Sequence, residues 1–131
     1  MFRMTMICFA VLCGSSLCNF AAQSTPKPLS TIDVTAPNDI ARVNAVNNAL
    51  SVLSGKVSAC VNAGRKPTIC QCSYPQELLK LRQTYASLIA QHPGWKDKLL
   101  TYRRVNNEGR SVSGTLVMQN LRRQLEILKC A

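Results

Sequence analysis

The cysteines constrain the fold of this chain most. Four of its seven cysteines lie after residue 24, at positions Cys60, Cys70, Cys72 and Cys130. The other three lie in an N-terminal apolar segment, at Cys8, Cys13 and Cys18. An even number of cysteines in a small exported chain predicts structural disulfides in an oxidising compartment. The fold must then bring four distant positions together.

Residues 1–24 have the pattern of a secretory signal peptide. Arg3 is the only charged residue before Lys27, and an apolar stretch runs from Met4 to Leu17. That stretch has the length of a signal core and is shorter than the roughly 20 residues that span a bilayer. We therefore expect this segment to be removed on export.

The cleavage site follows from the small residues after the apolar stretch. Ala22-Gln23-Ser24 places small side chains at the −3 and −1 positions, so Thr25 is the expected first residue of the mature protein. Cleavage after Ala21 or Ala22 is the alternative. No second apolar span follows, so we predict a periplasmic or secreted protein without a transmembrane segment after signal removal.

The size and charge of the chain limit it to one small basic domain. It has 131 residues, with 16 Lys and Arg against six Asp and Glu, for a formal net charge of +10. A chain of this length supplies one hydrophobic core. We assign residues 25–37, which contain three prolines, to a flexible leader. Residues 38–131 then form a single helical domain.

Three segments have the apolar spacing of helices. The first runs for about 24 residues from Asn38 to the Asn62-Ala63-Gly64 stop. The second begins at a capping box, Ser73 to Gln76, and ends at His92-Pro93-Gly94. The third is capped by Ser113 or Thr115 and ends near Cys130. The predicted fold class is mainly α, a small disulfide-stapled bundle of three helices.

The segment between the second and third helices is either a short helix or a β-hairpin. Lys98–Val105 fits both structures, and Asn106-Asn107-Glu108-Gly109 has a turn composition. If Cys130 bonds near the start of the second helix, the third helix must begin where the second one ends. A segment that starts and finishes at the same end of the molecule favours the hairpin, because a single straight helix would carry the chain to the other end.

The cysteine spacing leaves two disulfide pairings open. A bond between Cys70 and Cys72 would be strained, because only one residue separates them. The remaining choices are Cys60–Cys70 with Cys72–Cys130, which we favour, or Cys60–Cys72 with Cys70–Cys130. A thiol redox pair or a metal site is the alternative use of the four cysteines. A tetrathiolate zinc site usually draws on two close pairs, and this chain has one.

No residue pattern predicts catalysis. His92 is the only histidine and stands at a helix end before proline, where a polar group near the carbonyl end of the helix is the ordinary role. The six carboxylates are scattered, and no phosphate loop, nucleophile elbow or zinc-protease motif is present. We predict no enzyme, no catalytic residue, no bound metal and no cofactor.

The clearest candidate for partner binding is a group of cations around the predicted hairpin. Only Asp97 and Glu108 oppose this group, whose members are Lys96, Lys98, Arg103, Arg104 and Arg110. Such a surface attracts an acidic protein or an anionic envelope polymer. We therefore expect a monomeric, non-enzymatic binding protein of the inhibitor, immunity or envelope-accessory type. Nucleic acid is disfavoured, because the chain is exported and lacks interleaved aromatic residues. The alternative function is a periplasmic thiol redox or metal-binding protein.

Overall fold

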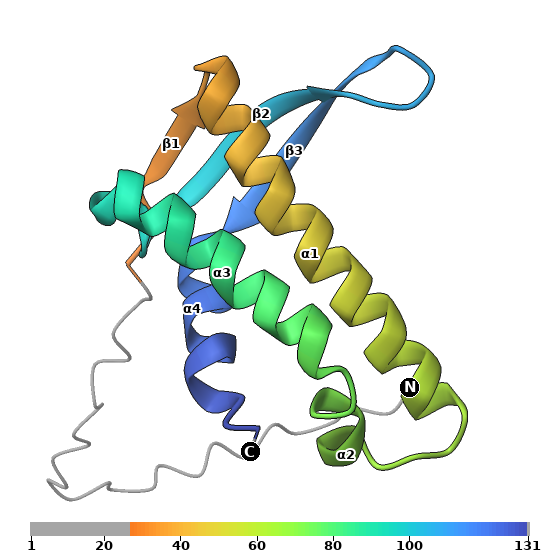
Figure 1. The fold of residues 1–131 in the computed structure, drawn as a ribbon. Helices are drawn as coiled ribbons and strands as arrows, with labels where there is room; N and C mark the ends of the chain where they lie inside the picture. Colours follow the sequence, from red (N-terminus) through yellow and green to blue (C-terminus); the bar gives the residue numbers. More distant parts are fainter. Residues whose placement is uncertain (1–26, 131) are drawn as a thin grey trace, which may run out of the picture.

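The computed structural model describes residues 27–130, so the predicted signal peptide lies outside the described residues. Figure 1 shows helices and strands mixed along the chain. In chain order, the elements are β1 (Thr31–Val34), α1 (Pro37–Asn62), α2 (Pro67–Gln71), α3 (Pro75–Gln91), the 3-10 helix η1 (Pro93–Trp95), β2 (Leu99–Val105), β3 (Ser111–Val117) and α4 (Met118–Ile127).

Proline stands at the start of three of the four α-helices: Pro37 in α1, Pro67 in α2 and Pro75 in α3. Proline suits the first turn of a helix because its ring fixes φ near the helical value. The N–H group that proline lacks would have no hydrogen-bond acceptor within the helix at that position. The capping box predicted for α3 is wrong. Ser73 Oγ instead donates to the carbonyl of Ile69 at 2.8 Å, which closes the end of α2.

The three strands form one sheet in the order β1-β2-β3, with β1 parallel and β3 antiparallel to β2. β1 lies within the segment that was predicted to be a flexible leader. Its Val34 pairs with Tyr102 and is 4% exposed. The ordered domain therefore includes Thr31–Val34, because β2 supplies both backbone partners and an apolar surface for this short strand.

The hairpin between the second and third long helices is confirmed. β2 and β3 pair from Leu99 with Val117 to Val105 with Ser111. Ser113 and Thr115, which were predicted to cap the last helix, lie inside β3. Helix α4 begins directly after the strand, at Met118, without a side-chain cap.

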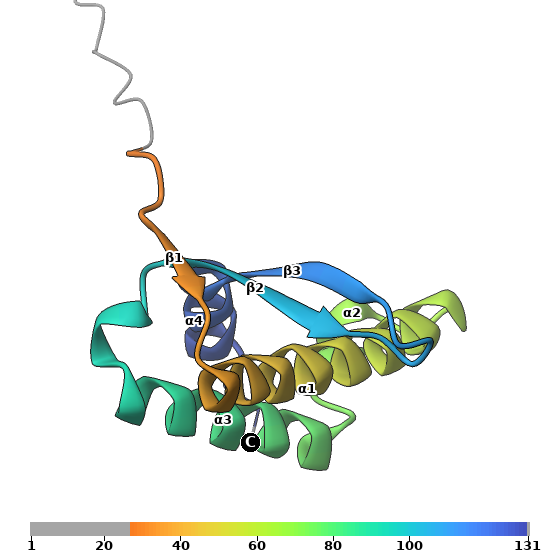
Figure 2. The same ribbon diagram turned by 90° about the horizontal axis from the view of Figure 1, so that it is seen from above.

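The elements form two layers (Figures 1 and 2). Helices α1 and α3 lie side by side and run in opposite directions, and the sheet and α4 lie against them as the second layer. One hydrophobic core joins the layers, and its most deeply buried side chains are Val43, Val46, Leu81, Leu88, Leu100, Met118 and Leu121. The fold is thus mainly helical with a small sheet, and the predicted three-helix bundle is not formed as such, because α4 continues the sheet layer.

The two disulfides have the pairing that the sequence favoured. Cys60 bonds to Cys70 with a Cα–Cα distance of 5.7 Å, and Cys72 bonds to Cys130 with 5.4 Å. The first disulfide holds α2 against the end of α1, and the second ties the segment after α4 to the segment before α3. Within residues 27–130, no helix has both the length and the apolar composition to cross a membrane.

Candidate partner-binding hairpin

The β2–β3 hairpin projects beyond the helices (Figure 1). Near its base, β2 is bordered by β1 on one side and β3 on the other. β1 ends opposite Tyr102, so Arg103, Arg104 and Val105 continue past it with β3 as their only neighbouring strand. All three of these residues are exposed.

The base of the hairpin is fixed by an aromatic side chain packed over a glycine. Tyr102 is 2% exposed and lies opposite Gly114. A Cβ at Gly114 would lie 2.5 Å from Cζ of the Tyr102 ring. Burial raises the pKa of Tyr102, against a smaller opposing effect of the Arg104 charge. The Tyr102 hydroxyl has no hydrogen-bond partner among the described residues.

The tip of the hairpin is closed by its own hydrogen bonds. Asn106 Oδ1 accepts from the backbone N–H groups of Glu108 and Arg110 at 3.0 and 2.9 Å. The Asn106 N–H donates to the Arg110 carbonyl at 2.9 Å, and Gly109 adopts a φ of +75°. Glycine takes this left-handed conformation without the penalty that a Cβ imposes. The tip is therefore preorganised by local sequence.

The five predicted partner-binding cations do not form one patch. Lys96 and Lys98 lie at the base of the hairpin, next to η1, whereas Arg103 and Arg104 lie toward its tip. Arg103 is five residue steps from Lys98, which correspond to about 17 Å in an extended strand. Arg110 stands at the tip itself.

Arg103 and Arg104 also point to opposite faces of the hairpin, because successive strand residues alternate. Arg104 shares the face of the buried Tyr102, and Arg103 shares the outer face with Thr101. Their adjacency in the sequence suggested one patch. The structure divides them between two faces.

Ion pairs separate the cations further. Arg110 pairs with Glu108 across the tip, at a highly exposed position. Asp97, the carboxylate between the two base lysines, pairs with Arg122 of α4 at 2.7 Å. Among the described residues, neither Arg103 nor Arg104 has a carboxylate within ion-pair distance. These two arginines are therefore the hairpin cations whose charge faces solvent at the projecting end.

Val105 belongs to this site although the sequence did not single it out. Its side chain is 71% exposed, directly after the two arginines. A single exposed valine is ordinary on a protein surface. It lies next to two arginines that have no ion-pair partner among the described residues, on a projecting element. The alternating pattern of Leu100, Tyr102 and Arg104 against Thr101 and Arg103 is the signal that could have indicated which residues leave the core.

His92 has a structural contact at the end of α3. Its ring stacks on Trp95 with centroids 3.8 Å apart, and its Nε2 lies 2.8 Å from Asp39 Oδ1. The hydrogen bond from His92 lowers the pKa of Asp39, and Arg42 adds to this effect. The group joins the start of α1 to the end of α3.

The four predicted disulfide residues all occupy the sulfur pairs described above, and Cys60 and Cys70 are buried. Within residues 27–130, no group of three or more histidine, cysteine or acidic side chains is arranged to hold a metal ion.

Neither family models, curated proteins nor solved structures contain a match to this chain. Fold and site alone therefore define its class. It is a small, mainly helical domain with a three-stranded sheet, two disulfides and a projecting basic hairpin.

Proposed function

We propose that this chain is an exported, non-enzymatic binding protein of the inhibitor or immunity type, which inserts the tip of its β2–β3 hairpin into an acidic cleft of a partner protein. The observation that carries the proposal is the exposed run Arg103-Arg104-Val105 on the part of β2 that extends past β1.

The charge of the run favours an acidic partner. Arginine can donate two parallel hydrogen bonds to one carboxylate, and its charge is retained at every physiological pH. Arg103 and Arg104 lie on opposite faces, so an inserted hairpin presents one guanidinium to each wall of a cleft. Val105 lies on the same face as Arg103 and nearer the tip, where an apolar part of the same wall would bury it.

The internal bonds of the hairpin favour tight binding. The Asn106 hydrogen bonds and the Tyr102–Gly114 packing order the tip before any partner arrives. A preorganised element loses less conformational entropy on association than a flexible loop. The protein would therefore retain more of its contact energy as affinity.

Export is supported by the residue pattern of the N-terminus and by the disulfides. Two disulfides in a small domain are typical of the periplasm or the extracellular space. We propose this location for the mature protein. The partner would then be a protein of the same compartment.

The test compares capture of acidic proteins from the periplasmic or secreted fraction of the source cells by two charge-reversed variants. The first variant is Arg103→Glu with Arg104→Glu. The matched control is Arg65→Glu with Lys66→Glu, which makes the same change in net charge on exposed residues far from the hairpin. We expect the hairpin variant to lose at least tenfold in affinity and the control to lose much less.

Salt and lipid separate the remaining explanations. Raising the salt from 0.1 to 1 M shortens the Debye length from about 10 to about 3 Å, and we expect it to weaken capture without abolishing it. Equal loss in both variants would contradict the proposal by leaving only attraction to net charge. Stronger binding to vesicles of anionic lipid than to any protein would replace the acidic protein with an envelope component.

A further inference from the structure

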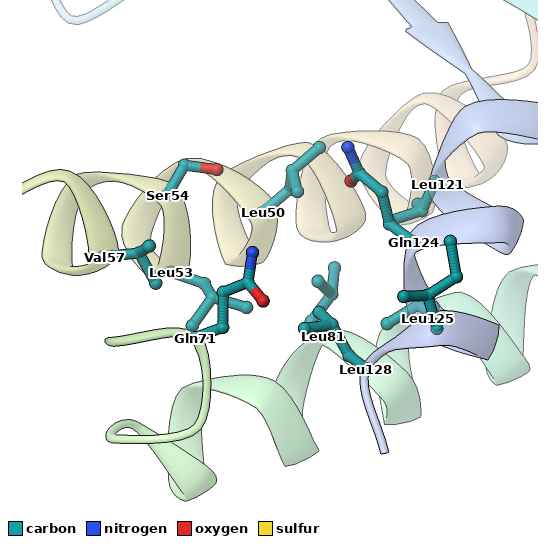
Figure 3. Close-up of a pocket in the computed structure, with 11 residues that line it drawn as sticks. Leu50, Leu53, Ser54, Val57, Gln71, Leu81, Leu121, Gln124, Leu125 and Leu128 are labelled. Carbon is teal, nitrogen blue, oxygen red and sulfur yellow. The ribbon is translucent and has the colours of Figure 1, made fainter. Parts of the chain in front are cut away.

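The cavity between α1, α3 and α4 lies apart from the hairpin. Its volume is about 320 Å³, and its lining comes mainly from leucines of the three helices. Figure 3 shows these side chains around an open space between α1 and α4. Leu53, Leu81 and Leu121 are buried in its wall, whereas Leu50 and Val57 are only partly covered.

The cavity has the size and composition of a small-molecule site. Ligand pockets usually have volumes of about 300–1,000 Å³, with mostly apolar walls and a few polar groups that fix orientation. The polar groups here are the amides of Gln71 and Gln124 and the hydroxyl of Ser54. In Figure 3, both amides point toward the space between the helices.

The lining of the cavity follows two helices. Its lining extends from Leu50 to Val57 along α1 and from Leu121 to Leu128 along α4. Seven residues of helix correspond to about 10 Å on each side. An apolar cavity of about 150 Å³ holds benzene, with six carbons, so this cavity of about 320 Å³ has room for about twelve carbons, in a chain that is bent because a fully extended one would be longer than the lining.

The charge of the protein favours an anionic head group on that chain. The full chain has a net charge of +10, and removal of the predicted signal peptide takes away only Arg3, so the remaining protein attracts anions. A carboxylate or phosphate accepts hydrogen bonds, and the Gln71 and Gln124 amides each have two donors to offer. We propose that this cavity binds a single-chain amphiphile with an anionic head, its alkyl chain between α1 and α4 and its head at the exposed rim, beside Gln71 or Gln124.

Calorimetric titration of the oxidised protein with alkyl carboxylates, below their micelle concentrations, tests the proposal. We expect saturable binding of one dodecanoate per protein. Each added methylene should increase affinity about fourfold until the cavity is full, near twelve carbons, and longer chains should gain little. The cation dodecyltrimethylammonium should bind at least tenfold more weakly than dodecanoate.

Two phenylalanine substitutions on α1 give a matched pair. Val57→Phe fills the cavity, whereas Val52→Phe places the same ring on an exposed position outside its lining. Val57→Phe should reduce dodecanoate affinity at least tenfold, and Val52→Phe should leave it within twofold. Thermal unfolding checks that both variants fold. If Val57→Phe does not fold, Ser54→Trp covers the cavity from an exposed position and should cause the same loss.

Two sources of the ligand share this chemistry, a free fatty acid and a lysophospholipid. Competition by a lysophosphatidylglycerol with a twelve-carbon chain identifies the second source, and its failure to compete identifies the first. Absence of saturable binding by the unmodified protein would overturn the proposal. Equal affinity of the Val57 and Val52 variants, or affinity that keeps rising beyond about fourteen carbons, would also overturn it.

Discussion

Substitution of Gly114 by alanine perturbs the base of the hairpin at one atom. Gly114 stands in β3 opposite Tyr102, and a Cβ there would lie 2.5 Å from Cζ, 2.9 Å from Cε2 and 2.9 Å from the hydroxyl of that ring. Ordinary van der Waals contact between carbons requires about 3.5–4.0 Å. The ring must therefore move by about 1 Å, against a core in which Tyr102 is 2% exposed.

The free energy of unfolding should fall accordingly. Adding one carbon to a packed core costs about 1–3 kcal/mol when neighbouring side chains must shift. For a domain of about 100 residues, each kcal/mol lowers Tm by about 4–8 °C. Urea denaturation of the oxidised protein, followed by circular dichroism, measures the change. An effect below about 0.5 kcal/mol would contradict the close packing of the ring on Gly114.

A double-mutant cycle assigns the loss to the ring. In a Tyr102→Ala background, the added Cβ meets no ring, so Gly114→Ala should cost close to nothing. The two substitutions should then show a coupling free energy equal to the clash, about 1–3 kcal/mol. The same cost in both backgrounds would refute the reasoning. Tyr102→Phe serves as the control, because removing a buried hydroxyl without a partner should be neutral or slightly stabilising.

Two further predictions concern the Cys72–Cys130 disulfide and the loss of stability at low pH. Replacing both Cys72 and Cys130 by serine opens a loop with a sequence separation of 58, which should lower the free energy of unfolding by about 4 kcal/mol. An unchanged urea midpoint would contradict the role of this bond in holding α4. Asp39→Asn should make the decrease in the free energy of unfolding at low pH smaller, because the His92 hydrogen bond lowers the pKa of Asp39 and the variant has no carboxylate to titrate there. The contribution of Asp39 is therefore complete above about pH 4 and is lost as the pH falls through that lowered pKa. Urea midpoints from pH 2 to 6 that are parallel for variant and parent would contradict this coupling.

The cysteine positions predicted more of the fold than helix periodicity did. Requiring Cys130 to lie near Cys72 places both ends of the segment 95–112 at one end of the molecule, and that condition favoured the hairpin that is observed. The apolar residues of α1 recur at helical spacing, and this spacing predicted which face of the helix is buried. Val43, Val46 and Leu53 lie on that face.

The parts that were not predicted depend on contacts between distant segments. β1 has only four residues, and its stability comes from β2, about 70 positions later in the chain. Ser113 and Thr115 suit both a helix cap and a strand, and the pairing with β2 decides between them. The cavity depends on how far α4 stands from α1, which no local pattern of residues specifies.

The separation of Arg103 from Arg104 could have been inferred from the sequence once a strand was expected. Alternation along β2 places them on opposite faces, whereas their adjacency in the chain suggested one patch. Alternation also places Val105 on the outer face, but its exposure of 71% depends on β1 ending opposite Tyr102, which the sequence did not indicate.

Partner affinity after Val105→Asp tests most directly whether the hairpin tip is the contact. Val52→Asp is the matched control, since it makes the same change on an exposed valine of α1, and the two side chains are 71% and 53% exposed. Burying the new carboxylate in an acidic cleft should weaken partner binding at least tenfold, while the α1 variant should bind within twofold of the unmodified protein. Equal binding by the two variants would contradict insertion of the hairpin.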